Sequence, residues 1–207
     1  MEFVFVVKRF DLFDLSFPHG FVARSPGDPR VEQWTARIRE RGFFLERRWA
    51  ERDSSFKQVI PYTLLACGDL LYLLQRTARG GEERLHGKLS LGVGGHVNPV
   101  DLAPGADVLD AGCRRELEEE VQIRTPYALE PVGVINDDAS DVGSVHFGLV
   151  NVARCETPDV AIRETDVLEG RFVPLAEVKQ LARTQRERFE TWSALILDRL
   201  DEALAAR

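Results

Sequence analysis

Two neighbouring stretches of this sequence determine how the whole chain is interpreted. The first is Gly94-Gly95-His96-Val97-Asn98-Pro99-Val100-Asp101, and the second is Arg115-Glu116-Leu117-Glu118-Glu119-Glu120-Val121-Gln122-Ile123. The glycine pair follows Lys88–Val93, whose alternating apolar residues predict a strand. The acidic run falls within residues 107–121, which predict a helix. The sequence therefore predicts a strand, a glycine turn that permits close approach of a ligand, a loop and a carboxylate-rich helix.

The predicted helix carries three glutamates on one face. Glu116, Glu119 and Glu120 are spaced i, i+3 and i+4, and like charges at this spacing destabilise a helix by about 0.2–0.5 kcal/mol per pair. A solvated acidic face that pairs with Arg114 and Arg115 is the simplest explanation of such a run. The glycine turn upstream lets the backbone approach a ligand closely and leaves its carbonyl oxygens available. Together with the carboxylates it favours the other explanation, a site for a hard divalent cation, because such cations prefer oxygen ligands.

Together the two stretches resemble the Nudix box, GX5EX7REUXEEXGU, in which U is an aliphatic residue. Gly95 takes the place of the first glycine, Asp101 that of the first glutamate, and residues 115–120 match REUXEE in full. The resemblance implies an α/β (α+β) fold, a Nudix-type α/β/α sandwich with a mixed central sheet. We expect residues 58–207 to form this domain and residues 1–57 to form an N-terminal α/β extension that packs on the core or on a dimer partner.

Three departures from the box concern the loop and the helix end. The first acidic residue is Asp101 instead of glutamate, residues 102–114 stand where the box has seven residues, and Gln122 replaces the final glycine. We expect a longer loop before the helix and an altered helix end. The three helix glutamates are untouched by these departures.

The resemblance also assigns roles to the matching residues. Arg115 would orient the glutamates by salt bridges and act in the catalytic site, and Asp101 would help to fix the loop. The cofactor implied is Mg²⁺ or Mn²⁺, which would activate water and neutralise phosphate charge. Its expected ligands are Glu116, Glu119, Glu120 and the backbone carbonyl of Gly94.

The catalytic base and the substrate contacts are less well defined by the motif. Glu119 is the first choice for the base, and the alternatives in a later loop are Glu164, Asp166 and Glu169. Arg76 ends a predicted strand near the expected cleft and could meet a substrate phosphate, although a surface arginine is the simpler interpretation. His96 follows the glycine pair and, like His146, is more often a structural residue. The candidate substrate-binding residues are Arg76, Asp101, His96, Glu164 and Glu169.

Other elements are predicted from periodicity along the chain. The first block has a strand at 3–7 and a helix at 29–41. The second has a hairpin of 58–67 and 70–75, then strands at 130–135, 145–153 and 170–173. A helix is expected to begin near Leu175, and a last one to run from Arg186 to Leu204.

Composition limits the classes of function. The chain has 207 residues, with 27 basic and 34 acidic residues and a formal net charge of −7, which disfavours sequence-independent binding of nucleic acid. Three separated cysteines indicate neither a disulfide framework nor a zinc site. We expect a cytoplasmic protein with a small nucleotide or other diphosphate as its partner, no nucleic acid or membrane partner, and a possible homodimer.

The expected activity is Mg²⁺-dependent hydrolysis of the diphosphate linkage of a small nucleotide. One alternative is a Nudix-fold sensor that binds a nucleotide without cleaving it, although such proteins usually lose helix glutamates that are kept here. Another is an enzyme similar to isopentenyl diphosphate isomerase, which needs a cysteine and a glutamate facing an alkene. Cys67 and Cys155 lie in no evident motif of that kind.

Overall fold

The structure, a computed structural model, describes residues 1–14, 17–77, 87–163 and 168–206. The first block contains β1 (Phe3–Lys8), α1 (Arg9–Leu12), β2 (Gly20–Ala23), α2 (Arg30–Arg41), β3 (Phe43–Glu46) and α3 (Arg47–Ala50). The middle of the chain contains β4 (Phe56–Cys67), β5 (Leu70–Arg76), β6 (Leu89–Ser90), β7 (Gly92–Gly94), the 3-10 turn η2 (Pro99–Asp101), α4 (Val108–Glu120) and β8 (Val121–Ile123). The last part contains β9 (Tyr127–Asn136), α5 (Asp141–Ser144), β10 (His146–Cys155), β11 (Val160–Ile162), β12 (Leu168–Pro174), α6 (Leu175–Thr184), the 3-10 turn η3 (Arg186–Arg188), α7 (Thr191–Leu197) and α8 (Leu200–Ala205).

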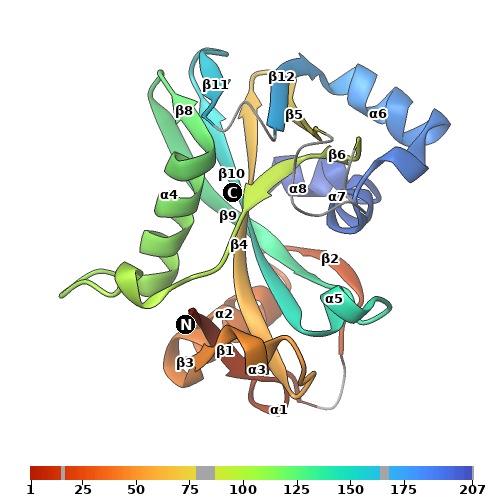
Figure 1. Cartoon of the computed structure of the whole chain (residues 1–207). Helices are drawn as coiled ribbons and strands as arrows, with labels where there is room; N and C mark the ends of the chain where they lie inside the picture. The colour runs from red at the N-terminus through yellow and green to blue at the C-terminus, as the bar shows by residue number, and fades with distance from the viewer. Residues whose placement is uncertain (15–16, 78–86, 164–167, 207) are drawn as a thin grey trace.

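The central sheet is mixed, as predicted. Its main path has the order β12-β5-β4-β10-β9-β2 (Figure 1). Off this path, β1 and β7 pair with β4, β6 pairs with β5, and β3 pairs with β1. β4 and β10 are parallel, whereas the β4–β5 hairpin and the other pairs of the path are antiparallel. The long strand β4 runs from the N-terminal block to the opposite end of the molecule and so connects the two parts of the chain (Figure 1). No helix of the described residues is long and apolar enough to cross a membrane.

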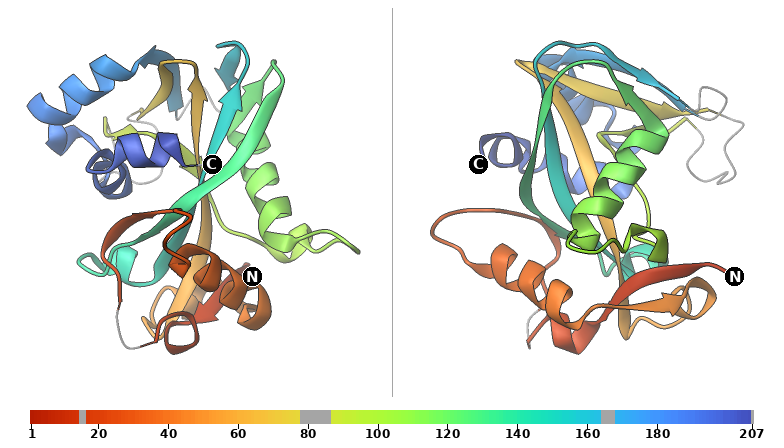
Figure 2. Two further views of the ribbon diagram at one scale, coloured as in Figure 1. Left: turned by 180° about the vertical axis from the view of Figure 1, so that it is seen from behind. Right: turned by 90° about the vertical axis from the view of Figure 1, so that its left-hand side faces the viewer.

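Alternate residues of β4 face two different helical layers. Leu64 packs in one buried cluster with Ile196 of α7 and Leu200 of α8. Its neighbour Leu65 packs in another cluster with Leu117 of α4. Successive side chains of a strand point to opposite faces of the sheet, so this alternation places α4 on one face and the C-terminal helices on the other (Figure 2). The result is the expected α/β/α sandwich.

The N-terminal block is joined to this sheet by strand pairing and shares its core. β1 pairs with β4, with Val6 opposite Gln58, and β2 pairs with β9. Phe13 makes edge-to-face contacts with Trp34 of α2 and Phe147 of β10, at centroid distances of 5.9 and 5.5 Å. Since β4 begins at Phe56, the chain passes from the first block into the second within one strand.

Two predicted elements are broken in the structure. The strand expected at 88–93 is split at Leu91, because β6 pairs with β5 whereas β7 pairs with β4. The helix expected from Arg186 to Leu204 is replaced by η3, α7 and α8. Its interruption follows from Phe189, which is buried and extended and bridges Leu89 of β6. Strand pairing with different partners divides the first element, and at Phe189 tertiary pairing outweighs helix propensity.

Candidate active site

The glycine turn at the end of β7 lies directly against the acidic helix. Gly94 pairs with Tyr62 of β4, and a methyl group added to it would meet the carbonyl oxygen of Pro61. A methyl group added to Gly95 would overlap the carboxylate of Glu116 on α4. The two stretches of the motif therefore meet in space, and only glycine allows the backbone to come this close to the helix.

Arg115 joins the helix to the preceding loop. Its Nε donates a hydrogen bond of 2.7 Å to Asp101 Oδ1, and its Nη2 donates one of 3.0 Å to Oδ2. Its Nη1 donates to Glu116 Oε1 at 2.8 Å and to Glu119 Oε2 at 3.1 Å. The hydrogen bonds to Asp101 and Glu116 hold the pKa of the guanidinium above its ordinary value. One cation thus orients three carboxylates.

The same arginine fixes the loop that follows the glycine turn. Its Nη2 donates to the carbonyl oxygen of His96 at 2.8 Å and to Asn98 Oδ1 at 3.1 Å. Asp101 is buried, and its Oδ2 also accepts a hydrogen bond of 2.8 Å from the Asn98 amide. Asp101 thus joins the loop to Arg115, and its contact with substrate stays a prediction. The longer segment after Asp101 includes Asp107, which caps the N-terminus of α4 through the amides of Leu109 and Asp110.

The three helix glutamates differ in their surroundings. The side chain of Glu116 is 15% exposed, and burial raises the pKa of its carboxyl although Arg115 opposes the shift. Glu119 is 58% exposed, and Glu120 lines a cleft. In the described ranges, no three acidic, histidine or cysteine side chains converge as a ready metal cluster. The assignment of these glutamates as metal ligands stays a prediction.

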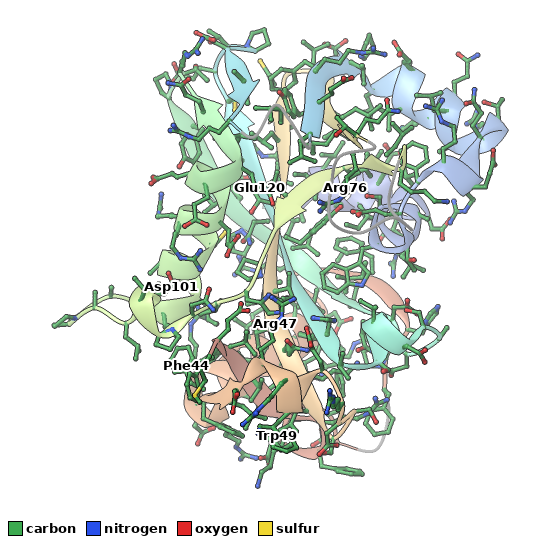
Figure 3. All side chains as sticks on the ribbon, in the orientation of Figure 1. Phe44, Arg47, Trp49, Arg76, Asp101 and Glu120 are labelled. Atoms are coloured by element: carbon green, nitrogen blue, oxygen red, sulfur yellow. The ribbon has the colours of Figure 1, made fainter. Side chains whose placement is uncertain are left out.

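This cleft has a volume of about 460 Å³ and lies beside the glycine turn. Glu120, Arg76 and Arg47 are found around it, between α4, the C-terminal helices and the N-terminal block (Figure 3). Other residues that line it are Lys88, Gly94, Gly95, His96, His146, Phe189, Glu190 and Trp192. The cleft therefore brings carboxylates, several cations and an aromatic wall to one place.

The structure places the remaining predicted residues as follows. Arg76 and His96 line the cleft. Glu169 is exposed on β12 opposite Gln75 and is absent from the cleft lining among the described residues. Glu164 and Asp166 lie outside the described residues. Sequence reasoning missed Arg47, Lys88, Glu190 and Trp192, which carry no local motif.

Two partly buried histidines line the end of the cleft nearest the N-terminal block. His96 Nε2 and Gln58 Oε1 are 3.0 Å apart, and the rings of His96 and His146 are 5.6 Å apart between centroids. Burial, Arg47 and His146 together lower the pKa of His96 to about 3. Burial also lowers the pKa of His146, so both rings are neutral at physiological pH.

A buried network attaches the C-terminal helices to the floor of the cleft. The hydroxyl of Tyr62 donates to Glu190 Oε1 at 2.6 Å and lies 2.9 Å from the hydroxyl oxygens of Ser90 and Ser193. Its ring contacts Trp192 edge to face at 5.7 Å. Burial and the Glu190 charge raise the pKa of Tyr62, which keeps the hydroxyl protonated as a donor. The aromatic wall is therefore held in place by hydrogen bonds.

Comparison with known proteins agrees with this arrangement. No protein-family model matches the chain. Protein YmaB of Bacillus subtilis (strain 168) is 38% identical over 207 residues, which cover 97% of this chain and 98% of that protein. The crystal structure of Tm1382, described as a Nudix hydrolase, has 30% identity, covers 96% of this chain and 98% of its own, and superposes with a TM-score of 0.78.

A more distant structure shares the fold alone. The NUDIX domain of Shewanella oneidensis NrtR, crystallised with ADP ribose, is 16% identical, covers 72% of this chain and 89% of its own, and has a TM-score of 0.54. The identity to Tm1382 over nearly the whole of both chains, together with the complete REUXEE motif on α4, defines the class. The chain belongs to the Nudix hydrolase family and is an enzyme of that class.

Proposed function

We propose that this enzyme hydrolyses the diphosphate linkage of a small nucleotide with the help of Mg²⁺ or Mn²⁺. The observation that carries the proposal is the contact between Gly95 and the Glu116 carboxylate, beside a cleft that Glu120 also lines. Two cations, Arg76 and Lys88, line the same cleft. A nucleoside diphosphate linked to another moiety presents the negative charges and the apolar base that such a cleft can bind.

The residues at the turn fit a hard divalent cation. Carboxylate and backbone carbonyl oxygens are the ligands that Mg²⁺ and Mn²⁺ prefer. Glu116 is mostly buried with its pKa raised, so a cation would offset the cost of its negative charge. Arg115 now binds Glu116 and Glu119, so the glutamate side chains would rotate to complete the set of metal ligands. The proposed ligands are Glu116, Glu119, Glu120 and the Gly94 carbonyl.

When bound, the cation would lower the pKa of water and neutralise phosphate charge. Arg115 would keep the glutamates oriented through its hydrogen bonds to Asp101, Glu116 and Glu119. Glu119, the most exposed of the bonded carboxylates, is proposed as the base that takes a proton from the attacking water.

Arg76 is proposed to bind a phosphate oxygen of the substrate. Its Nε is buried and has no hydrogen-bond partner among the described residues, although the side chain lines the cleft. A buried N–H group without a partner costs free energy, and a phosphate oxygen would satisfy it. Trp192, which is only partly buried, lines the same cleft and would pack against a nucleobase.

The alternative chemistry of an isomerase gains no support from the cysteines. Burial raises the pKa of Cys155 to about 11, and Cys67 contributes to the same shift. Neither thiol is among the described residues that line the cleft.

The proposed division of the chain, an N-terminal extension at 1–57 and a hydrolase domain at 58–207, is compatible with a single shared core.

A hydrolysis screen tests the proposed function. Purified protein with Mg²⁺ or Mn²⁺ is incubated with ADP-ribose, nucleotide sugars, dinucleoside polyphosphates and modified nucleoside triphosphates, and nucleotide products are separated by chromatography. We expect nucleoside monophosphate from at least one nucleoside-diphosphate compound, and none in EDTA. Tight binding of a nucleotide without turnover would favour the sensor alternative, and neither binding nor turnover would reject the proposal.

A further inference from the structure

We propose that Arg47, from the N-terminal block, contacts the substrate and binds one of its phosphate oxygens. This proposal rests on the proposed function and adds a residue that lies outside the Nudix motif. It also gives the N-terminal block a role in the reaction, because that block would complete the substrate site. The proposal stands on where Arg47 lies, how it is held and what surrounds it.

Arg47 lies at the cleft although it is far from the motif in sequence. It is the first residue of α3 (Figure 3), and it lines the cleft together with Gly95 and His96. Its side chain is 40% exposed, so a ligand can reach it. Arginine suits phosphate oxygens because its planar guanidinium can present two N–H groups to them at once.

Two carboxylates hold the Arg47 guanidinium in a fixed orientation. Its Nη1 donates to Glu2 Oε2 at 3.0 Å, and its Nε donates to Glu51 Oε1 at 2.7 Å. Its backbone amide also donates to the Glu2 carbonyl at 2.9 Å. Within the described residues, Nη2 has no hydrogen-bond partner. The side chain is thus oriented before a ligand arrives, which lowers the entropy cost of binding.

Hydrogen bonds join the N-terminal block to the loop after the glycine turn. They fix the position of Arg47 relative to the site. The Phe5 amide of β1 donates to the Val97 carbonyl at 2.8 Å. The Asn98 side chain donates to the Phe3 carbonyl at 2.8 Å, while its oxygen accepts from Arg115. β1 and the loop after the glycine pair are therefore joined by backbone and side-chain hydrogen bonds.

The electrostatics of the cleft give Arg47 a specific place in substrate binding. Arg47 brings its guanidinium to the cleft from the N-terminal block, where His96 and His146 also line it. Arg76, the last residue of β5, and Lys88, the residue before β6, add two more cations to the lining. A substrate with several phosphate oxygens could contact more than one of these cations in the same cleft.

Arg48 provides a matched control in the same helix. It pairs with Glu46 at 2.6 Å, lies over the ring of Trp49 at 5.1 Å and is 60% exposed. It does not line the cleft. Arg48→Ala therefore removes the same charge from the same short helix without touching the proposed site.

The test measures binding and turnover separately in the full chain. Binding of inorganic pyrophosphate in EDTA is measured by calorimetry for the wild type, Arg47→Ala, Arg47→Lys and Arg48→Ala. We expect Arg47→Ala to weaken binding at least fivefold, Arg47→Lys to recover part of the loss, and Arg48→Ala to stay within twofold of the wild type. On the nucleotide found in the screen, Arg47→Ala should raise KM more than it lowers kcat.

The outcomes separate this proposal from the proposed function. Equal binding by Arg47→Ala and Arg48→Ala would overturn the role of Arg47, even if hydrolysis is found. A wild type without saturable pyrophosphate binding would also overturn it. Binding that depends on Arg47, in a protein that hydrolyses no nucleotide, would support the phosphate contact and reject the proposed function. If Arg47→Ala unfolds, Arg47→Lys and Arg47→Gln decide the result.

Discussion

Gly95 and Glu116 are in direct contact, so that a methyl group on Gly95 would occupy the space of the Glu116 carboxylate. The Gly95→Ala substitution should therefore displace this carboxylate and reduce kcat at least tenfold, with a smaller effect on stability. Gly27→Ala is the control, because a methyl group there meets nothing within 4 Å. Steady-state kinetics and thermal unfolding compare the two variants. Full activity of Gly95→Ala would show that the contact is dispensable.

Arg115 should matter for activity much more than its neighbour Arg114. Arg115→Ala removes the hydrogen bonds that orient Glu116 and Glu119 and leaves Asp101 buried without its cation. We expect kcat/KM to fall at least tenfold and the free energy of unfolding to decrease by about 3 kcal/mol. Arg114, which is exposed, serves as the control. Equal kinetics and urea unfolding for Arg115→Ala and Arg114→Ala would contradict the orienting role.

Lys57 and Asp138 should be essential for attaching the N-terminal block. Lys57 is fully buried, and its Nζ donates to Asp138 Oδ1 at 2.7 Å, while Arg9 pairs with the same carboxylate at 2.6 Å. Asp138→Asn leaves a buried cation without its counter-charge, so we expect a loss of about 3 kcal/mol in urea unfolding. Asp141→Asn changes an exposed aspartate nearby and should cost under about 0.5 kcal/mol. Similar stability of the two variants would rule out this role.

The free energy of unfolding should fall on acidification through the histidine range. Burial lowers the pKa of His146 below its ordinary value of 6.5, and that of His96 to about 3. Below pH 6.5 the two histidines bind protons in the unfolded chain but not in the folded state. Their contribution to the free energy of unfolding is therefore complete above pH 6.5 and declines toward pH 3. His146→Asn should flatten this slope in urea unfolding measured from pH 7 to pH 4.5. An unchanged slope in His146→Asn would contradict this contribution.

Much of the fold follows from local patterns in the sequence. The hairpin of β4 and β5 and the helix α4 were predictable, because alternation and the i+4 stripe are properties of single segments. The interruption at Phe189 was not, since it depends on pairing with Leu89, 100 residues earlier. The four-residue strands β2 and β3 are likewise too short to show a period.

The candidate site likewise has residues that local sequence patterns predict and residues that they do not. The spacing within Arg115–Glu120 predicts that carboxylates share a helix face, and the contact with Gly95 confirms that the two parts of the motif meet. Arg47 and Trp192 could not be predicted, because they reach the cleft through the pairing of β1 with β4 and through the Tyr62 network. Residues that depend on long-range packing leave no local signal.

The central claim is that the carboxylates of α4 make this chain a metal-dependent hydrolase. The most direct test compares Glu120→Gln with Glu118→Gln, because Glu120 lines the cleft whereas Glu118 is exposed on the same helix. The rate of nucleoside monophosphate release is measured with Mg²⁺ and the nucleotide found in the screen. We predict at least a hundredfold loss for Glu120→Gln and less than a threefold change for Glu118→Gln. Equal rates for the two variants would contradict the account.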